Sequence, residues 1–227
     1  MEREEQQPTI ITKVEKQKRG KHRYNIFLNE EYAFSVHEDI LIKHRLAKGE
    51  NVNLQEIEKI IEDEERNNAY MKAIRVIGRR PHSSSELKRK LKESGYELPI
   101  VEWVLHKLDQ QKYLNDEEFA KMWTESRVIS QKKGRNLVRQ ELEQKGIHKD
   151  LVKHALEHIN PEDELAGALK LAQTKWKTTS GEPFDKRRKT AAFLMRRGYT
   201  GSVVNKVLSQ ISSDAGEEEF EISDDYF

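Results

Sequence analysis

The segment His154-Ala155-Leu156-Glu157-His158 has the spacing of a zinc-protease motif and is the first candidate for chemistry in this chain. In such a motif, histidines hold Zn²⁺ and a neighbouring glutamate acts as general base. A zinc hydrolase also needs a third ligand and an open coordination position, and the sequence marks neither. His154, Glu157 and His158 fall on the polar side of an expected helix, so we interpret them as solvent-facing side chains.

Other motifs of catalysis are weaker. Ser85-Glu86-Leu87-Lys88 has the serine–lysine spacing of some acyl-transfer enzymes, but its serine belongs to a helix-capping run and no partner motif follows. The sequence contains no glycine-rich loop of the kinds that bind nucleotides. It also contains no cysteine, which excludes disulfides and thiolate metal ligands and favours a reducing compartment. We therefore expect no enzyme activity, no metal and no cofactor.

Basic side chains are the remaining candidates, because they gather where the first and second helices of three expected repeats meet. Residues 67–210 carry 29 basic and 18 acidic side chains, although the net charge of the whole chain is only +1. Such a surface suits a phosphate backbone or an acidic protein groove. The alternative is that long Lys and Arg side chains only coat wet helices. The candidate binding residues are Arg79, Arg80, Lys88, Arg89, Arg127, Lys132, Lys133, Arg135, Arg139, Arg187, Arg188, Arg196 and Arg197.

Three tryptophans could offer stacking surfaces for nucleobases. Trp123 and Trp176 lie on periodic apolar faces, which favours packing in the core. Trp103 lies on the polar side of its expected helix and is the better candidate for contact with a partner.

The elements that must position these residues follow from an internal repeat. Gly95, Gly146 and Gly198 are separated by 51 and 52 residues, and six positions around each glycine are apolar in all three units. Offsets of +6, +9, +10 and +13 from the glycine mark one face of a helix. Each glycine suits the left-handed position that ends the preceding helix. The apolar sets are Leu91, Tyr96, Val101, Val104, Leu105 and Leu108; Leu142, Ile147, Val152, Ala155, Leu156 and Ile159; and Leu194, Tyr199, Val204, Val207, Leu208 and Ile211.

Each unit also has a leading helix and helix-start signals. Expected capping residues are Ser83 with Glu86, Asn115 with Glu118, and Asn160 followed by Pro161. The unit is therefore three helices that occur three times. Repeats of this size stack side by side, so we predict a mainly α protein in which three tandem three-helix repeats form an elongated, curved array.

A small β-hairpin or three-strand module with helices precedes the repeats. Strands are predicted around Ile10–Val14, Tyr24–Leu28 and Tyr32–Val36, because apolar residues alternate there between turn signals. Ser35 with Glu38 predicts a capping box for a helix ending near Gly49, and Asn53 with Glu56 predicts another. The expected domains are residues 1–66 (strand-and-helix module), 67–113, 114–160 and 161–212 (three repeats) and 213–227 (disordered acidic tail).

Composition agrees with an extended helical protein. Hydrophobic residues make up 35% of the 227 residues and charged residues 36%, with a mean hydropathy of −0.90. This is too polar for one deep core, whereas helices with one buried stripe fit it well. No apolar run could span a bilayer, and the first residues have no signal-peptide character. We expect a cytoplasmic monomer without a membrane anchor.

Three segments of the chain resemble the RecX family. Arg79-Arg80-Pro81-His82-Ser83-Ser84-Ser85-Glu86-Leu87, with Leu91 through Gly95, is similar to the opening of RecX proteins. Leu114-Asn115-Asp116-Glu117-Glu118-Phe119-Ala120 is similar to a second family segment, and Arg127, Gly134, Leu142 and Lys145-Gly146-Ile147 to a third. The match spans about residues 67–212 and is less regular in the third repeat.

This resemblance implies a regulator of the RecA recombinase in DNA repair, recombination and the SOS response, without a cofactor or catalytic residues. Family members bind the helical groove of the RecA–DNA filament and inhibit it or promote its disassembly. The resemblance thus implies the RecA filament as partner. From the basic residues we also expect weaker, electrostatic binding to single- and double-stranded DNA. Inhibition, disassembly and remodelling remain open.

Two other functions also fit the sequence. A general DNA-binding helical repeat would bind naked DNA with steep salt dependence and no need of RecA. A protein-interaction scaffold would use its basic residues only as solvated surface. Residues 211–227 hold seven acids and no Lys or Arg, and this tail either competes with DNA for the basic residues or only aids solubility.

Overall fold

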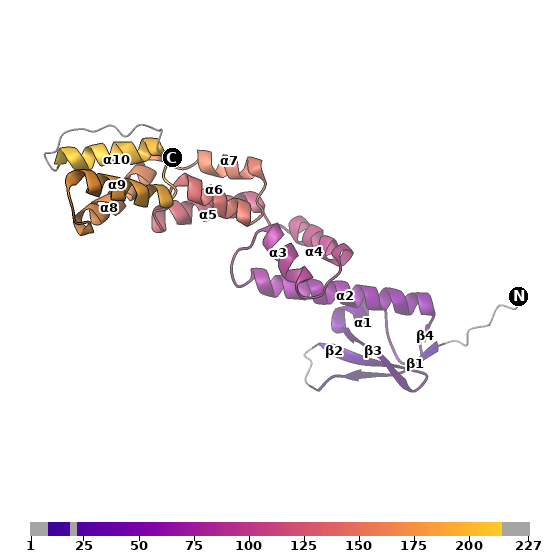
Figure 1. Cartoon of the computed structure of the whole chain (residues 1–227). Helices are drawn as coiled ribbons and strands as arrows, with labels where there is room; N and C mark the ends of the chain where they lie inside the picture. The colour runs from indigo at the N-terminus through magenta and orange to yellow at the C-terminus, as the bar shows by residue number, and fades with distance from the viewer. Residues whose placement is uncertain (1–8, 19–21, 215–227) are drawn as a thin grey trace, which may run out of the picture. The chain divides into compact units, whose positions relative to one another are not determined.

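The computed structural model describes residues 9–18 and 22–214, which form two compact units (Figure 1). The first unit comprises the chain up to Arg80 together with Leu87–Gln111. The second comprises Pro81–Glu86 and the chain from Lys112 onward. The expected tail at 213–227 lies almost wholly outside the described residues. Among the described helices, none is both long and apolar enough to cross a membrane.

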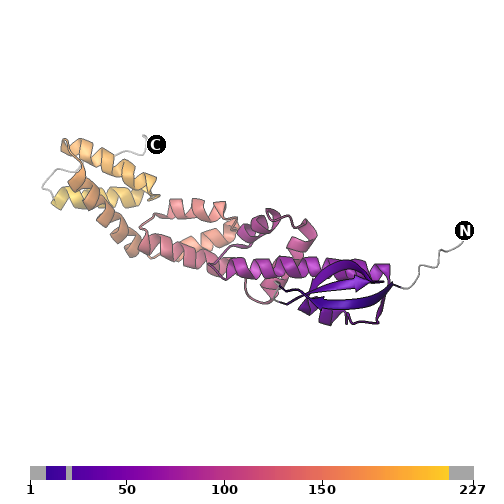
Figure 2. The same cartoon turned by 90° about the horizontal axis from the view of Figure 1, so that it is seen from below.

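The first unit begins with an antiparallel sheet in the order β3-β2-β1-β4. The three predicted strands are present as β1 (Thr9–Lys16), β2 (Arg23–Leu28) and β3 (Glu31–His37). A fourth strand, β4 (Asn51–Val52), pairs with the start of β1 and was not predicted, because two residues are too short to show alternation. Figure 2 shows the sheet lying along the first long helix. Between them lies a core that includes Ile11, Ile26, Val36, Ile40 and Ile60.

A two-residue turn joins β2 to β3, and both of its residues have positive φ angles, 49° at Asn29 and 71° at Glu30. This is the conformation that favours the Asn-Gly sequence. Neighbouring groups hold the turn in place, since the N–H of Ile10 donates to Asn29 Oδ1 at 3.0 Å and the N–H of Glu30 donates to Thr12 Oγ1 at 2.9 Å. The side chain of Glu30 therefore occupies a position that suits glycine.

Replacing Glu30 with glycine should stabilise the first unit by about 0.5 kcal/mol, because the relief of left-handed strain exceeds the added entropy of the unfolded chain. Chemical denaturation with urea would measure the change. The matched control is Glu31→Gly, since Glu31 lies in the extended strand β3 and glycine there should destabilise. A lower midpoint for Glu30→Gly than for the natural chain would contradict the expectation.

For the helix after β3, the sequence predicted a capping box of Ser35 with Glu38 and an end near Gly49, and both predictions were wrong. Helix α1 (Glu38–Lys43) begins after His37, whose ring accepts a hydrogen bond from the N–H of Asp39. Ser35 instead lies in β3, and its hydroxyl accepts a hydrogen bond from Arg23. The helix ends well before Gly49, because Arg45 adopts a positive φ of 51° and turns the chain away.

Helix α2 (Leu54–Ile77) has the predicted capping box between Asn53 and Glu56. It is continuous across residues 66 and 67, where the sequence analysis placed a boundary between the N-terminal module and the first repeat. Its buried Asp63 accepts hydrogen bonds from Lys43 and His44, each at 2.7 Å. Burial acts to raise the pKa of Asp63, but these bonds outweigh it and hold the pKa below the usual 3.8.

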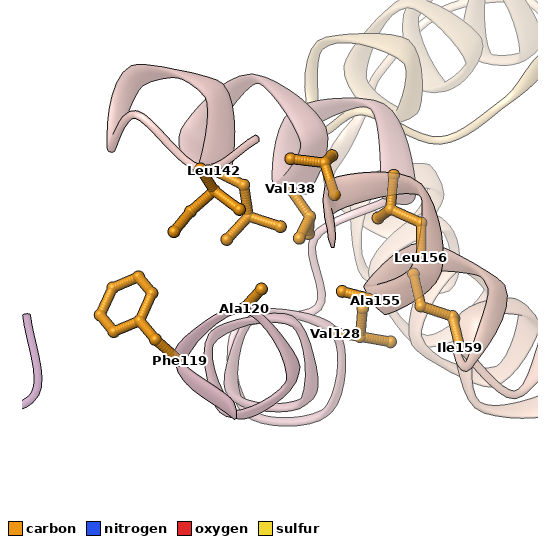
Figure 3. Close-up of a cluster of buried hydrophobic side chains, with 10 residues drawn as sticks. Phe119, Ala120, Val128, Val138, Leu142, Ala155, Leu156 and Ile159 are labelled. Atoms are coloured by element: carbon orange, nitrogen blue, oxygen red, sulfur yellow. The ribbon is translucent and has the colours of Figure 1, made fainter. Parts of the chain in front are cut away.

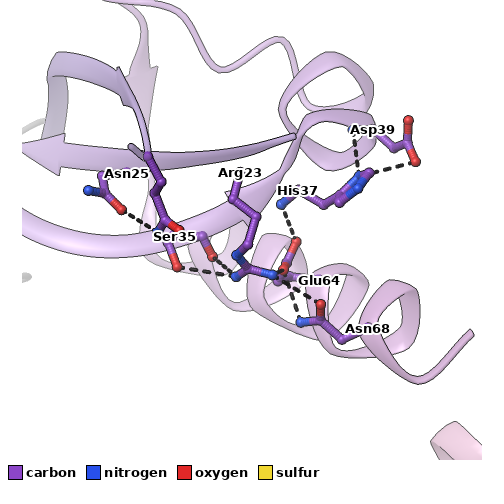
Figure 4. A network of polar contacts seen from close by, with 8 residues as sticks. Arg23, Asn25, Ser35, His37, Asp39, Glu64 and Asn68 are labelled. Atoms are coloured by element: carbon purple, nitrogen blue, oxygen red, sulfur yellow. Dashed lines mark hydrogen bonds and ion pairs between the residues drawn. The ribbon is translucent and has the colours of Figure 1, made fainter. Parts of the chain in front are cut away.

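A second buried carboxylate of α2, Glu64, ties the helix to the sheet (Figure 4). Arg23 Nη1 lies 2.8 Å from Glu64 Oε1 and donates to Asn68 Oδ1 at 3.1 Å. The backbone N–H of His37 donates to Glu64 Oε2 at 2.6 Å. These bonds fix the sheet against the middle of α2.

Three three-helix repeats follow, as the sequence predicted. The first consists of the end of α2 with α3 and α4; the second of α5, continued by a π-helical turn (η1), with α6 and α7; and the third of α8, α9 and α10. The predicted caps at Ser83, Asn115 and Asn160 are present. The bounds are α3 Ser84–Lys92, α4 Leu98–Gln110, α5 Asp116–Glu125, η1 Ser126–Ser130, α6 Arg135–Gln144, α7 Lys149–Glu157, α8 Pro161–Thr178, α9 Pro183–Arg196 and α10 Gly201–Asp214.

Each repeat closes around the apolar positions that the alignment identified. In the second repeat, Leu142 of α6 and Leu156 of α7 face Phe119 and Val128 of the leading helix (Figure 3). The third repeat has an equivalent core that includes Leu194, Tyr199 and Leu208. The fold is therefore mainly α, with a small four-stranded sheet at its N-terminal end.

The three repeat glycines end their helices in the same way. Their φ angles are 90° at Gly95, 73° at Gly146 and 87° at Gly198. In each case the residue after the glycine donates its N–H to the carbonyl five residues earlier, as from Ile147 to Leu142 at 3.1 Å. This is the Schellman arrangement, which needs a left-handed residue and favours glycine.

Two of these glycine turns also join one repeat to the next within the second unit. The Gly146 turn lies on the start of α3, where Ser83 Oγ donates to the carbonyl of Lys145 at 2.6 Å. The Gly198 turn lies on the start of α6, where the N–H groups of Gly134 and Asn136 donate to the carbonyls of Arg197 and Gly198 at 2.9 and 3.0 Å. In both contacts, the C-terminal end of the second helix of one repeat meets the N-terminal end of the second helix of the preceding repeat: α6 meets α3, and α9 meets α6. We call these two contacts the glycine joints.

Candidate nucleic-acid interface

The thirteen basic residues proposed from the sequence divide into exposed and internal groups. Arg79, Arg80, Arg89, Arg139, Arg188 and Arg196 are exposed, and Lys88, Lys132 and Arg197 are partly exposed. Arg127, Lys133, Arg135 and Arg187 are engaged within the fold. The sequence pattern could not separate the two groups, because both occur at similar places in the repeats.

Two residues of the exposed group, Arg89 and Arg188, have weak ion pairs within the fold. Arg89 Nε lies 3.8 Å from a Glu93 carboxylate oxygen, and Arg188 Nη2 lies 3.2 Å from one of Asp185. Exposed pairs of this kind contribute little to stability and can exchange for other anions. Arg139 has no ion pair among the described residues and projects from α6 into solvent. These side chains can reach a phosphate or an acidic surface without disrupting the fold.

In the second repeat, cationic and aromatic side chains surround Glu141 of α6. Its carboxylate accepts hydrogen bonds from Lys133 Nζ at 2.5 Å, Arg127 Nε at 2.8 Å and Trp123 Nε1 at 2.9 Å. The Arg127 guanidinium also lies 3.7 Å from the centre of the Trp123 ring, and Lys145 Nζ lies 4.1 Å from it. Trp123 is therefore a packing residue, as predicted, and two of the proposed binding residues serve this cluster.

The Glu141 cluster should make the second unit sensitive to acid. Burial acts to raise the pKa of Glu141, but the bonds from Lys133, Arg127 and Trp123 outweigh it and hold the pKa below the usual 4.5. A lowered pKa contributes stability that is complete above the unfolded value and is lost as the pH falls through the folded value. This contribution should therefore disappear progressively below pH 4.5.

We expect Glu141→Gln to lower the free energy of unfolding by about 2 kcal/mol near neutral pH, since charged hydrogen bonds are lost. The difference from the natural chain should shrink as the pH falls below 4.5. Urea denaturation followed at several pH values measures both. The control is Glu143→Gln, because Glu143 is exposed on the same helix. A difference independent of pH would show that the carboxylate charge does not stabilise the cluster.

Arg135, at the start of α6, binds a carboxylate of the third repeat. Glu164 of α8 is only 1% exposed, and its two oxygens accept hydrogen bonds from the Arg135 backbone N–H at 3.0 Å and from Nε and Nη2 at 2.9 and 2.7 Å. Tyr199 supports the same contact, since its hydroxyl donates to the carbonyl of Lys132 at 2.8 Å. Burial and the Glu164 charge raise the pKa of Tyr199 to about 12, so it stays protonated and remains a donor.

Arg187 occupies the equivalent position in the third repeat and is also internal. It is only 7% exposed, and its Nη1 donates to Ser212 Oγ at 3.2 Å. No sequence signal marks Glu141, the partner of Arg127 and Lys133, or Glu164, the partner of Arg135. The repeat alignment places Lys90 and Phe193 at the positions that match Glu141, so the alignment could not reveal its role.

The polar side chains of the zinc-protease motif are exposed, His154 and Glu157 on α7 and His158 directly after it. His154 Nδ1 lies 3.5 Å from Glu117 Oε1, and the rings of His154 and His158 are 4.5 Å apart. In the part of the chain that the structure describes, no group of three His, Asp or Glu side chains is placed to hold a metal ion. Trp103 is partly covered, because Lys107 Nζ and the Arg66 guanidinium lie 4.8 and 5.7 Å from its ring centre.

Comparison with known proteins adds an independent finding. Four segments match the family profiles of RecX: the regulatory protein RecX N-terminal domain at residues 9–53, and the first, second and third three-helix domains at 69–108, 115–156 and 162–208. Regulatory protein RecX of Halalkalibacterium halodurans is 32% identical over 215 residues, covering 92% of this chain and 81% of that protein. RecX of Bacillus cereus is also 32% identical, over 92% of this chain and 79% of that protein.

Solved structures give the same result. A crystal structure of regulatory protein RecX superposes with a TM-score of 0.74 at 31% identity, covering 88% of this chain and 99% of that chain. RecX from Lactobacillus salivarius, at 16% identity, shares the fold with a TM-score of 0.60 over 66% of this chain and 97% of that chain.

Proposed function

Because the chain belongs to the RecX family of regulatory proteins, we propose that it binds the RecA–DNA filament and modulates RecA activity in DNA repair and recombination. Family membership carries this proposal. The exposed basic residues of the three repeats support it, since they can meet the phosphates of the filament and acidic surface of its protomers. In this proposal the protein acts by binding and not by catalysis.

The proposed mechanism is a shift in filament stability. A protein that binds one filament state more tightly than another moves the equilibrium toward the bound state by that difference in affinity. The exposed Arg79, Arg89, Arg139, Arg188 and Arg196 are the proposed contacts. Arg127, Lys133, Arg135 and Arg187 instead hold the repeats in the shape that presents those contacts.

The test is the DNA-dependent ATPase of purified RecA, titrated with the full chain at substoichiometric amounts. We expect inhibition, and we expect Arg139→Glu to weaken it about tenfold by reversing an exposed contact. The matched control is Lys153→Glu, an exposed lysine on α7 of the same repeat outside the proposed set. No effect of the natural chain at saturation would contradict the proposal. Tight, salt-steep binding to naked DNA with no effect on RecA would instead favour a general DNA-binding protein.

A further inference from the structure

The N-terminal sheet carries a row of one basic and two aromatic side chains. Lys13 of β1 pairs with Phe27 of β2, and Phe27 pairs with Tyr32 of β3, so the three side chains are neighbours across the strands. The alternate residue Ile26 belongs to the core that packs against α1 and α2. Phe27 thus alternates along β2 with this core residue, and its side chain points to the opposite face of the strand. Figures 1 and 2 show α1 and α2 packed along the sheet.

The aromatic rings of this row are not part of the core. Tyr32 is 59% exposed, and its ring lies 5.9 Å from that of Phe27 at an interplanar angle of 78°. Lys13 Nζ lies 5.2 Å from the centre of the Phe27 ring. An exposed ring beside a second ring and an ammonium group is the combination that binds a nucleobase and its phosphate.

A pair of amides on the same sheet adds hydrogen-bonding groups. Gln17 Nε2 donates to Asn25 Oδ1 at 2.7 Å, and Asn25 lies two residues from Phe27 on β2 and therefore on the same face. Within the described residues, Gln17 Oε1 and Asn25 Nδ2 have no hydrogen-bond partner. One acceptor and one donor side by side match the edge of an unpaired base.

The charge around the row favours an anionic ligand. The described residues 9–18 and 22–37 carry four Lys and Arg side chains against three acids. Lys13 itself lies 3.1 Å from Glu15, but both side chains are about half exposed, so the pair is weak and can exchange for a phosphate. Duplex DNA hides the faces of its bases, whereas a single strand offers both bases and phosphates.

The geometry points to a binding site for single-stranded nucleic acid on this face, with a base stacked on Tyr32 and a phosphate held by Lys13. Asn25 and Gln17 contact the edge of the neighbouring base. This site uses none of the exposed basic residues of the three repeats and does not depend on RecA. It gives the N-terminal module a function of its own.

The experiment measures binding of a short labelled oligo(dT) to the full chain by fluorescence anisotropy, without RecA. We expect Tyr32→Ala to weaken binding about tenfold, because stacking on one base is lost. Tyr32→Phe keeps the ring and should bind as the natural chain does. Lys13→Ala should reduce the salt dependence of log Kd by about 0.7, as for one phosphate contact. The matched control is Tyr113→Ala, which removes a tyrosine of identical exposure, 59%, outside the sheet.

Two results would overturn the inference. Tyr113→Ala could weaken oligo(dT) binding as much as Tyr32→Ala does, or Tyr32→Ala could bind oligo(dT) as tightly as the natural chain. If Tyr32→Ala in the second case also abolished inhibition of the RecA ATPase, the face would be assigned to a protein partner. Thermal unfolding of each variant confirms that the sheet is intact. Failure of the RecA assay alone, with these oligo(dT) results obtained, would contradict the proposed function and leave this site standing.

Discussion

Replacing Arg135 with alanine should destabilise the second unit by about 3 kcal/mol, because it leaves a buried carboxylate without its cation. Glu164 is 1% exposed and would keep only the hydrogen bond from the backbone N–H of residue 135. An uncompensated charge in that position costs more than the original pair contributed. Urea denaturation monitored by tryptophan fluorescence measures the loss, since Trp123 and Trp176 lie in the second unit.

The control for this prediction is Arg139→Ala, one helical turn further along α6, where the side chain is exposed. Its cost should be within about 0.5 kcal/mol of zero. The double variant Arg135→Ala/Glu164→Ala should be no less stable than Arg135→Ala alone, since removing the orphaned carboxylate relieves its desolvation. An equal effect of Arg135→Ala and Arg139→Ala would show that the buried pair does not hold the repeats together.

Replacing Gly198 with alanine should cost about 3 kcal/mol, from the sum of two effects. A side chain at a φ of 87° is strained by about 1 kcal/mol. The new Cβ would also overlap the backbone and side chain of Leu137, which forces the glycine joint apart and adds about 2 kcal/mol. Hydrogen exchange provides a local readout, because the amides of Gly134 and Asn136 donate into this turn and should lose protection.

Gly95→Ala is the matched control, since Gly95 has the same backbone conformation, with a φ of 90°, but its added Cβ would meet nothing within 4 Å. It should cost only the strain of about 1 kcal/mol. The comparison separates the two roles of a repeat glycine, to end a helix and to admit a neighbouring one. If both variants were equally destabilised, the close contact at Gly198 would contribute nothing.

The repeat architecture could be predicted because its signals are local or periodic. The apolar offsets from Gly95, Gly146 and Gly198 define helix faces directly, and the structure buries nearly all of those positions. The caps at Ser83, Asn115 and Asn160 were predicted from neighbouring residues for the same reason. The capping box predicted at Ser35 was wrong, because a serine three residues before a glutamate can also lie in a strand when tertiary contacts favour the strand.

The division of the basic residues could not be predicted, because it depends on contacts between distant segments. Arg135 and Arg139 are one turn apart on α6, yet one binds a buried carboxylate and the other faces solvent. The difference is set by Glu164, which lies in the next repeat. Counting charges along the sequence therefore overstated the number of cations that are free to bind a partner.

The π-helical turn at Ser126–Ser130 and the short strand β4 also carried no sequence signal. A π-helical turn holds one extra residue, but a segment of only five residues is too short for the sequence to show the resulting shift in the hydrophobic pattern. Arg127 lies within this turn and pairs with Glu141. The zinc-protease motif is the reverse case, a sequence signal without a site, because its polar residues have the right spacing but lie on an exposed surface.

The glycine joints have a consequence for how the chain assembles as it leaves the ribosome. The start of α6 is completed by carbonyls of residues 197 and 198, which are synthesised about sixty residues later. The start of α3 likewise awaits the turn at residues 145 and 146. Each of the first two repeats thus emerges with a second helix whose N-terminal end is completed only by the following repeat, so segments made late complete the structure of segments made earlier. Loss of the last repeat would for this reason also destabilise the start of α6, although the sequence of that helix is unchanged.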